Sequence, residues 1–233
     1  MKTGQLEPRL TVIPHTEILR YLGCSKEPDP STQALVQRAA GAMMEAIRPK
    51  VVWRLFDIAV HPQGLILPQS GLVLPGQDLQ KHLTGCREVV LLAATLSSAA
   101  DAIIRRGQIE DLAFGVALDS SATAAIEEVC NLAQCSIAED FTDSYLTSRF
   151  SPGYGDLPIT LQGDLLTLLD APRRIGLCAN QSSILTPRKS VTAFIGISHT
   201  PPLPSRGCAS CSLIKSCAFR RKGLDGCTRR NEG

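Results

Sequence analysis

Residues 149–156, RFSPGYGD, form the stretch of this chain best equipped to hold a ligand. Pro152 fixes its own φ and Gly153 can adopt positive φ, which predicts a tight turn whose main chain a ligand can approach. Arg149 contributes a planar guanidinium that suits a carboxylate or phosphate. Tyr154 adds a flat ring with a polar tip. Taken alone, the octet favours a surface turn that carries one solvated arginine, and only its flanking sequence makes it informative.

Four cysteines near the C-terminus supply a candidate metal site. They are Cys208, Cys211, Cys217 and Cys227. Four thiolates suit tetrahedral zinc or an iron–sulfur cluster, and reduced thiols this close together would otherwise be exposed to oxidation. The uneven loops between them do not match paired C-x2-C knuckles, which argues against a zinc ribbon. An unstructured tail of free cysteines is the alternative.

The segment that holds these cysteines differs in charge from the rest of the chain. Residues 206–233 contain seven basic and two acidic residues, a net charge of +5, whereas the whole chain has +2. This positive charge would offset the negative charge of a thiolate-bound cluster. The proline-rich run that begins at Thr200 is expected to be a linker. We therefore predict a domain over residues 1–200 and a metal-binding tail over residues 201–233.

Composition favours a soluble cytoplasmic protein. At 233 residues and 44% hydrophobic content, the chain can bury a full core. The N-terminus has no apolar secretory segment, and the longest apolar run, residues 89–96, is too short to span a bilayer. Disulfides are not expected in that compartment. The remaining cysteines are predicted to be small core residues, namely Cys24, Cys86, Cys130, Cys135 and Cys178.

The elements that position these residues mix helices and strands without a regular βαβ alternation, which predicts an α+β fold. Strands are expected at residues 51–56, 88–95, 174–178 and 190–197, and a hairpin at 65–67 and 72–74. Helices are expected from Ser31 to Pro49, at residues 78–83, at 97–107 behind a Ser97–Ser98 cap, and at 161–169.

The longest helix is predicted to open at Asp119, with apolar residues at helical spacing from Ile126 to Ile137. Its first turns are mostly Ala, Ser and Thr, so another backbone or a flat ligand could pack closely against them. Glu127 and Glu128 are interpreted as a solvated face. Lys189 either approaches a ligand or is a solvated loop residue.

Three blocks in order resemble the activation (reactivation) domain of cobalamin-dependent methionine synthase. Residues 149–154, RFSPGY, resemble the R-x-x-P-G-Y motif of that domain. Residues 175–177 (IGL) and 185–193 (LTPRKSVTA) resemble a second block. Residues 82–86 and 89–96 are similar to stand-alone versions of the domain, except that Ser97 stands where their T-L-G pattern has Gly. The resemblance covers about residues 30–198.

The resemblance implies a curved, mainly antiparallel sheet flanked by helices that binds S-adenosylmethionine. The family reduces cob(II)alamin to cob(I)alamin, which then takes the methyl group of S-adenosylmethionine, a methyltransferase-type step that needs no catalytic residue. Arg149 would pair with the ligand carboxylate. Backbone groups of Ser151, Pro152 and Gly153 would contact adenine or ribose, and Tyr154 would pack on the ligand or the corrin.

Because the chain lacks cobalamin-binding modules, the implied partner is a methionine synthase without its own activation domain. A flavodoxin-like or other donor would supply the electron, and a low-potential iron–sulfur cluster in the tail could relay it, so iron–sulfur is preferred to zinc. Two alternatives stay open. One is an iron–sulfur protein that reduces a corrinoid protein without S-adenosylmethionine. The other is a zinc-stabilised module that binds nucleic acid, against which the 4% aromatic content counts.

Overall fold

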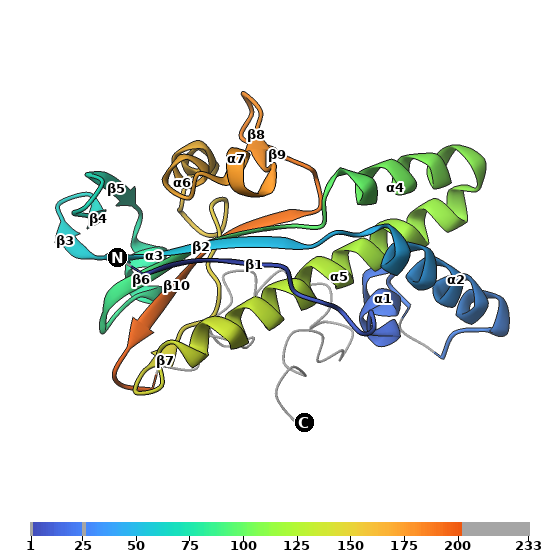
Figure 1. Ribbon diagram of the computed structural model, residues 1–233, viewed down its shortest axis with the longest axis horizontal. Coiled ribbons are helices and arrows are strands. Elements are labelled where there is room, and N and C mark those ends of the chain that lie inside the picture. Colours follow the sequence, from blue (N-terminus) through green and yellow to red (C-terminus); the bar gives the residue numbers. More distant parts are fainter. Residues whose placement is uncertain (1, 25–26, 202–233) are drawn as a thin grey trace.

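A five-stranded antiparallel sheet forms the centre of the protein, seen here in a computed structural model that describes residues 2–24 and 27–201 (Figure 1). In spatial order the strands are β1 (Thr3–Leu6), β2 (Lys50–Asp57), β6 (Cys86–Thr95), β10 (Ser190–Ser198) and β7 (Tyr145–Leu146). Helices cover both faces. The predicted fold class, α+β with a curved antiparallel sheet flanked by helices, is confirmed.

The central strands read as continuous apolar runs because both of their faces are buried. Along β6, Val90 and Leu92 join the core under one face, whereas Val89 and Leu91 join the core under the other. This alternation follows from the two-residue period of a strand. The strands predicted at residues 51–56, 88–95 and 190–197 are therefore confirmed as β2, β6 and β10.

One face of the sheet packs against four helices. They are α1 (His15–Tyr21), α2 (Pro30–Ala46), α4 (Ser98–Glu110) and α5 (Leu112–Glu139). The small-residue face of α5 lets neighbouring elements come close, since Ala117, Ala122 and Ala125 are fully buried. A Cβ on Gly115 would lie 2.5 Å from the backbone nitrogen of Gln108, so the reversal from α4 into α5 requires glycine there.

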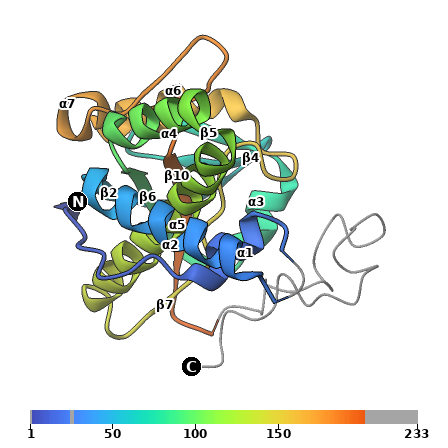
Figure 2. The same cartoon turned by 90° about the vertical axis from the view of Figure 1, so that its right-hand side faces the viewer.

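The opposite face carries smaller elements, which lie above the sheet in Figure 1 or at its left end. They are β3 (Ala59–His61), β4 (Gly64–Leu67), β5 (Leu72–Pro75), α3 (Gln77–His82), the 3-10 turn Ile159–Leu161, α6 (Gln162–Leu168), α7 (Ala171–Ile175), β8 (Cys178–Ala179) and β9 (Leu185–Thr186). The predicted hairpin is β4–β5, and the predicted helices at 78–83 and 161–169 correspond to α3 and α6. Viewed at 90° in Figure 2, α6 and α7 lie on the other side of the sheet from α1 and α2.

Several predicted boundaries are wrong. Asp29, not Ser31, caps α2, because its carboxylate accepts the amides of Ser31 and Thr32 at 2.9 and 3.0 Å. The longest helix begins at Leu112 rather than Asp119, since Asp111 caps it. The strand predicted at residues 174–178 is wrong except for Cys178, which belongs to β8: α7 runs from Ala171 to Ile175, and Gly176, with φ 69°, ends it.

Ser97 occupies the cap position of α4, but its side chain makes no capping bond, contrary to prediction. Ser97 has φ 79° and ψ 168°, a conformation almost confined to glycine. Its hydroxyl oxygen is buried and has no hydrogen-bond partner.

The cysteines also divide differently from the prediction. Cys130 is buried and Cys86 is half-buried, but Cys24, Cys135 and Cys178 are exposed. The four tail cysteines and the boundary proposed near residue 200 lie at or beyond the end of the described residues. Within the described part, no helix is both long and apolar enough to cross a membrane.

Candidate functional site

Arg149, which follows β7, lies at the centre of a polar cluster whose other members are side chains of α5. Its guanidinium donates to Glu127 Oε2 at 3.0 Å, Asn131 Oδ1 at 3.0 Å and Gln134 Oε1 at 3.1 Å. The Arg149 side chain is only 9% exposed, whereas that of Glu127 is 32% exposed. Arg149 is therefore not a solvated surface arginine. Glu127, interpreted from sequence as a solvated residue, is its ionic partner.

The backbone around Arg149 is fixed to the sheet. Phe150 forms a two-way backbone pair with Phe194 of β10, with N···O distances of 3.0 and 2.8 Å. His82 Nε2 lies 2.7 Å from the carbonyl oxygen of Ser148, and its ring lies 5.1 Å from that of Phe150. These contacts hold both sides of Arg149 and direct its side chain toward α5.

Residues 151–157 form the predicted turn. The Tyr154 amide donates to the Ser151 carbonyl at 3.1 Å, and the Gly153 amide donates to the Leu157 carbonyl at 2.9 Å. Gly153 has φ 89°, which explains the glycine, and Pro152 is buried. Because the Gly153 amide and the Ser151 carbonyl are used within the turn, the side chains of Arg149 and Tyr154 are better placed than these two backbone groups to contact a ligand.

The end of the turn is tied to α3. Asp156 accepts the amide of Gln77 at 2.6 Å and that of Asp78 at 3.0 Å. These two backbone hydrogen bonds hold the pKa of the Asp156 carboxyl below its usual range. Asp156 thus serves as a distant N-terminal cap for α3 and anchors the turn.

A polar stripe continues along α5 from this cluster. Its members recur every three or four residues on one face of the helix: Asp119, Thr123, Glu127, Asn131 and Gln134. At its other end, Lys189 Nζ lies 3.0 Å from Asp119 Oδ1 and 2.8 Å from Thr123 Oγ1. The Lys189 side chain is 16% exposed, so it is not the solvated loop lysine that one reading allowed.

The groups around the cluster have no nucleophilic character. Burial raises the pKa of Cys130 to about 12, so its thiol is neutral at physiological pH. Partial burial of its hydroxyl, followed by the nearby Glu127 carboxylate, raises the pKa of Tyr154, whose residue surface is 59% exposed. Neither Cys130 nor Tyr154 is therefore activated as a base or nucleophile, and what the described residues of the site offer is charge and hydrogen bonds that can bind and orient a ligand.

Of the residues predicted from sequence, Arg149 contacts Glu127, and Tyr154 lies close enough for the charges of Glu127 and Arg149 to affect its pKa. Ser151, Pro152 and Gly153 shape the turn at residues 151–157. Sequence reasoning missed Glu127, Asn131 and Gln134. Their spacing of four and three residues places them on one face of the predicted helix, and this polar face could have indicated a partner such as Arg149. Among residues 2–24 and 27–201, no group of three or more His, Cys, Asp or Glu side chains is placed to hold a metal ion.

Comparison with known proteins identifies a similar fold. No protein-family model matches the chain, and no curated protein sequence matches it. Among solved structures, it is similar to the crystal structure of the MetH reactivation domain bound to AdoHcy. The TM-score is 0.54 at 14% sequence identity, and the match covers 97% of this chain and 87% of that one. At this identity, the likeness establishes the fold.

Proposed function

We propose that this chain is a stand-alone reactivation factor that binds S-adenosylmethionine and supports reductive methylation of a cobalamin-dependent methionine synthase. The observation that carries the proposal is the Arg149–Glu127 ion pair, which lies beside the turn containing the R-x-x-P-G-Y sequence. Support comes from the fold, which is similar to that of the MetH reactivation domain bound to AdoHcy.

An ion pair of this kind suits the amino-acid head group of S-adenosylmethionine. That head group carries one carboxylate and one ammonium. The ligand carboxylate would replace Glu127 on the planar fork of Arg149, and the displaced Glu127 carboxylate would accept the ligand ammonium. The exchange needs no net change in buried charge. Glu127 is the partner that would move in this exchange, because its side chain is 32% exposed, whereas that of Arg149 is 9% exposed.

The rest of the ligand would lie along the polar stripe and the turn. Tyr154 is exposed and makes an edge contact with Phe150 at 6.2 Å between ring centroids, so its ring can pack on adenine or face the corrin. We retain Ser151, Pro152 and Gly153 as ligand contacts through backbone atoms that the turn does not use. Positioning of this kind is what the reaction requires from the protein.

The proposed reaction has two steps. A one-electron donor, flavodoxin-like or similar, reduces cob(II)alamin on the partner to cob(I)alamin. The cobalt electron pair then forms a bond to the methyl carbon of S-adenosylmethionine, and the C–S bonding pair stays on sulfur, which leaves AdoHcy. The partner is a methionine synthase without an activation domain. We further propose that Cys208, Cys211, Cys217 and Cys227 hold an iron–sulfur cluster that would relay the electron. If they hold zinc instead, the site is structural and the external donor reduces cobalamin directly.

Direct binding tests the proposal first. Calorimetric titration with S-adenosylmethionine and AdoHcy should give saturable binding by the wild-type protein. Arg149→Ala should weaken it at least tenfold, which corresponds to about 1.4 kcal/mol. Arg106→Ala is the matched control, since Arg106 is an exposed arginine paired with Glu110 on α4. Wild-type protein that binds neither ligand would refute the proposal.

Reconstitution tests the reaction. The purified factor, a chemical or flavodoxin reductant and a methionine synthase without its activation domain should convert cob(II)alamin to methylcobalamin only when S-adenosylmethionine is present. Reduction that is independent of S-adenosylmethionine would instead support an iron–sulfur corrinoid reductase.

A further inference from the structure

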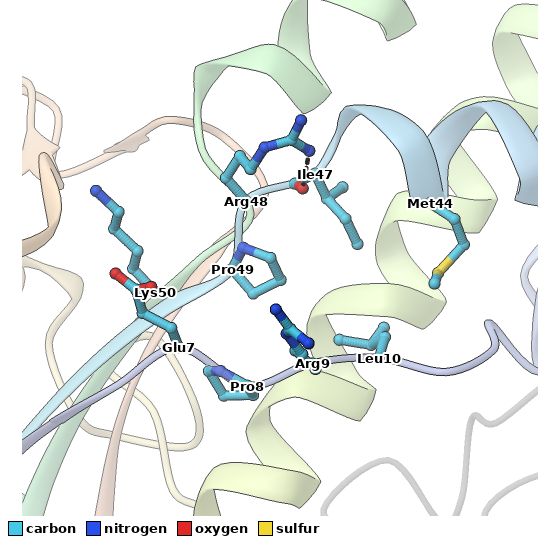
Figure 3. A pocket seen from close by; sticks show the side chains of 9 residues that line it. All are labelled: Glu7, Pro8, Arg9, Leu10, Met44, Ile47, Arg48, Pro49 and Lys50. Atoms are coloured by element: carbon cyan, nitrogen blue, oxygen red, sulfur yellow. Dashed lines mark hydrogen bonds between the residues drawn. The ribbon is translucent and has the colours of Figure 1, made fainter.

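The hollow at the β1 side of the central sheet holds charges that do not converge. It has a volume of about 610 Å³ and lies between the segment that follows β1 and the connection from α2 to β2 (Figure 3). The charged ends of Arg48 and Lys50 point away from Arg9, and Arg48 donates to backbone carbonyls. The side chains around Arg149, in contrast, converge on one guanidinium, and hydrogen bonds extend from them as far as α3.

Thr147, two residues before Arg149, connects the Arg149 cluster to β10. Its carbonyl accepts Gln134 Nε2 at 3.0 Å, and Gln134 Oε1 accepts Arg149 Nη1 at 3.1 Å. The Thr147 hydroxyl oxygen accepts the Gly196 amide at 2.8 Å, and its hydrogen goes to the Ser148 carbonyl at 3.1 Å. Thr147 is only 3% exposed, so water competes little for these hydrogen bonds. A single buried residue thus holds the amide group that orients the Arg149 guanidinium.

His82, the last residue of α3, holds the same segment from another side. Its Nε2 lies 2.7 Å from the Ser148 carbonyl oxygen and 3.1 Å from Thr147 Oγ1. Because a carbonyl oxygen can only accept, Nε2 carries the hydrogen. The packing here is tight, since a Cβ on Gly196 would lie 2.6 Å from Cys86 Sγ and 3.1 Å from Thr147 Cγ2. Residues 147 and 148 are therefore held jointly by α3, β6 and β10.

The other end of α3 is tied to the far side of the same turn. There, Asp156 accepts the backbone amides of Gln77 and Asp78, the first two residues of α3. The segment that carries Arg149 and Tyr154 therefore lies between two points of attachment to one short helix. Since both ends of the segment are fixed to α3, a change at either end of this helix is expected to move the ligand-binding side chains.

We propose that His82 is a positioning residue of the S-adenosylmethionine site. Its Nε2–H group fixes Thr147 and Ser148, and through Thr147 and Gln134 it keeps the guanidinium of Arg149 in the orientation that a ligand carboxylate requires. His82 need not contact the ligand for this role. The inference rests on the proposed function, because the ligand concerned is S-adenosylmethionine or AdoHcy.

Three substitutions of His82 separate its hydrogen bond from its packing. His82→Phe keeps a ring beside Phe150 but removes the donor. His82→Asn has an amide that is too short to reach the position of Nε2, whereas His82→Gln places an amide N–H close to it. We expect His82→Phe and His82→Asn to bind S-adenosylmethionine and AdoHcy about three- to tenfold more weakly in calorimetry, and His82→Gln to stay within about twofold of wild type. His15→Gln is the control, since His15 is exposed at the start of α1.

A measurement without ligand tests the same role. The coupling energy between Arg149 and Glu127 is obtained from urea denaturation of a double-mutant cycle with Arg149→Met and Glu127→Gln. In the His82→Phe background this coupling should fall to less than about half of its wild-type value, and in the His82→Gln background it should be retained. If His82 only stabilised the fold, His82→Phe would destabilise all four members of the cycle equally and leave the coupling unchanged.

An Arg149–Glu127 coupling that is unchanged in both His82→Phe and His82→Asn would overturn the inference. Equal affinities of these two variants and the wild-type protein, for a ligand that the wild-type protein binds, would overturn it as well. If the wild-type protein binds neither S-adenosylmethionine nor AdoHcy, the proposed function is refuted, and the coupling measurement alone then decides whether His82 positions Arg149.

Discussion

The guanidinium of Arg149 and the carboxylate of Glu127 lie 3.0 Å apart, although 22 residues separate them in the chain. The pair joins the middle of α5 to the segment between β7 and the turn at residues 151–157. Asn131 and Gln134 each accept one further guanidinium hydrogen, so the charge of a nearly buried arginine is paired and three of its N–H groups are hydrogen-bonded. The same contacts therefore stabilise the fold and hold the proposed ligand-binding fork.

Arg149→Ala should destabilise the protein as well as weaken ligand binding. Removing the guanidinium takes away its three hydrogen bonds to Glu127, Asn131 and Gln134, and we expect a loss of about 2 kcal/mol in the free energy of unfolding. Arg149→Lys should keep part of the stability but not the paired geometry that a carboxylate needs. Urea denaturation and calorimetry on the same samples separate the two effects. Unchanged stability of Arg149→Ala would contradict the cluster described here.

Ser97→Gly should stabilise the protein. Glycine removes the strain of φ 79° and the buried hydroxyl without a partner, and these gains exceed its entropic cost in the unfolded chain, for a net gain of about 1 kcal/mol. Ser97→Ala removes only the hydroxyl and should gain less. Ser98→Gly is the matched control, because Ser98, the first residue of α4, has no positive φ and no buried unpartnered hydroxyl among the described residues, so glycine relieves nothing there. Denaturation midpoints that fall equally for both glycine variants would refute this account.

The elements that sequence predicts well are those whose pattern depends on local burial. The run from Val89 to Leu92 is apolar throughout because each side of β6 meets a core, and hydrophobicity alone is enough to locate the strand. The position of Ser97 at a site that favours glycine was also visible, through the T-L-G pattern of the resemblance.

Contacts between distant segments were not predictable in the same way. The sequence predicted that the longest helix opens at Asp119, whereas in the structure it begins at Leu112 behind the Asp111 cap. The helix keeps a glycine at residue 115 because a Cβ there would meet Gln108 of α4. Glu127 looked like a surface residue because nothing nearby in the chain neutralises it. Its partner, Arg149, lies beyond the end of α5 and beyond β7 in the chain.

Asp156 should make the stability of the protein dependent on acid pH. Backbone hydrogen bonds from Gln77 and Asp78 lower the pKa of this carboxyl below its ordinary value of 3.8 in the folded state. The contribution to stability is therefore fully present above the unfolded pKa and is lost as the pH falls through the lower folded pKa. Asp156→Ala should lower the melting temperature by a constant amount above about pH 5, and the gap should narrow toward pH 3.

Asp143→Ala serves as the matched control for this pH series, because Asp143 is exposed and makes no hydrogen bond with other described residues. Its melting curve should follow that of the wild-type protein at every pH. A gap between wild type and Asp156→Ala that widens on acidification would contradict the capping role.

Thiol labelling should distinguish the exposed cysteines from the buried one. Iodoacetamide at pH 8 should modify Cys24, Cys135 and Cys178 quickly, because all three are exposed. Cys130 should react only after denaturation, since burial raises its pKa to about 12 and removes access. Peptide mapping by mass spectrometry measures each site. Fast labelling of Cys130 in the native protein would contradict its position in the core.

The same labelling tests the proposed iron–sulfur tail. Thiolates that bind one cluster are all shielded from alkylation while the cluster is intact. Cys208, Cys211, Cys217 and Cys227 should therefore be protected together in protein purified without oxygen. Iron chelation with mild oxidation should make all four cysteines reactive in one step. It should also remove the broad visible absorption that thiolate-bound iron gives. Cys135 provides the internal control, since its labelling should not change. If the four tail cysteines react as fast as Cys135 before chelation, the cluster is excluded. If they are protected in a colourless protein that contains one zinc, the site is structural and an external donor alone supplies the electron.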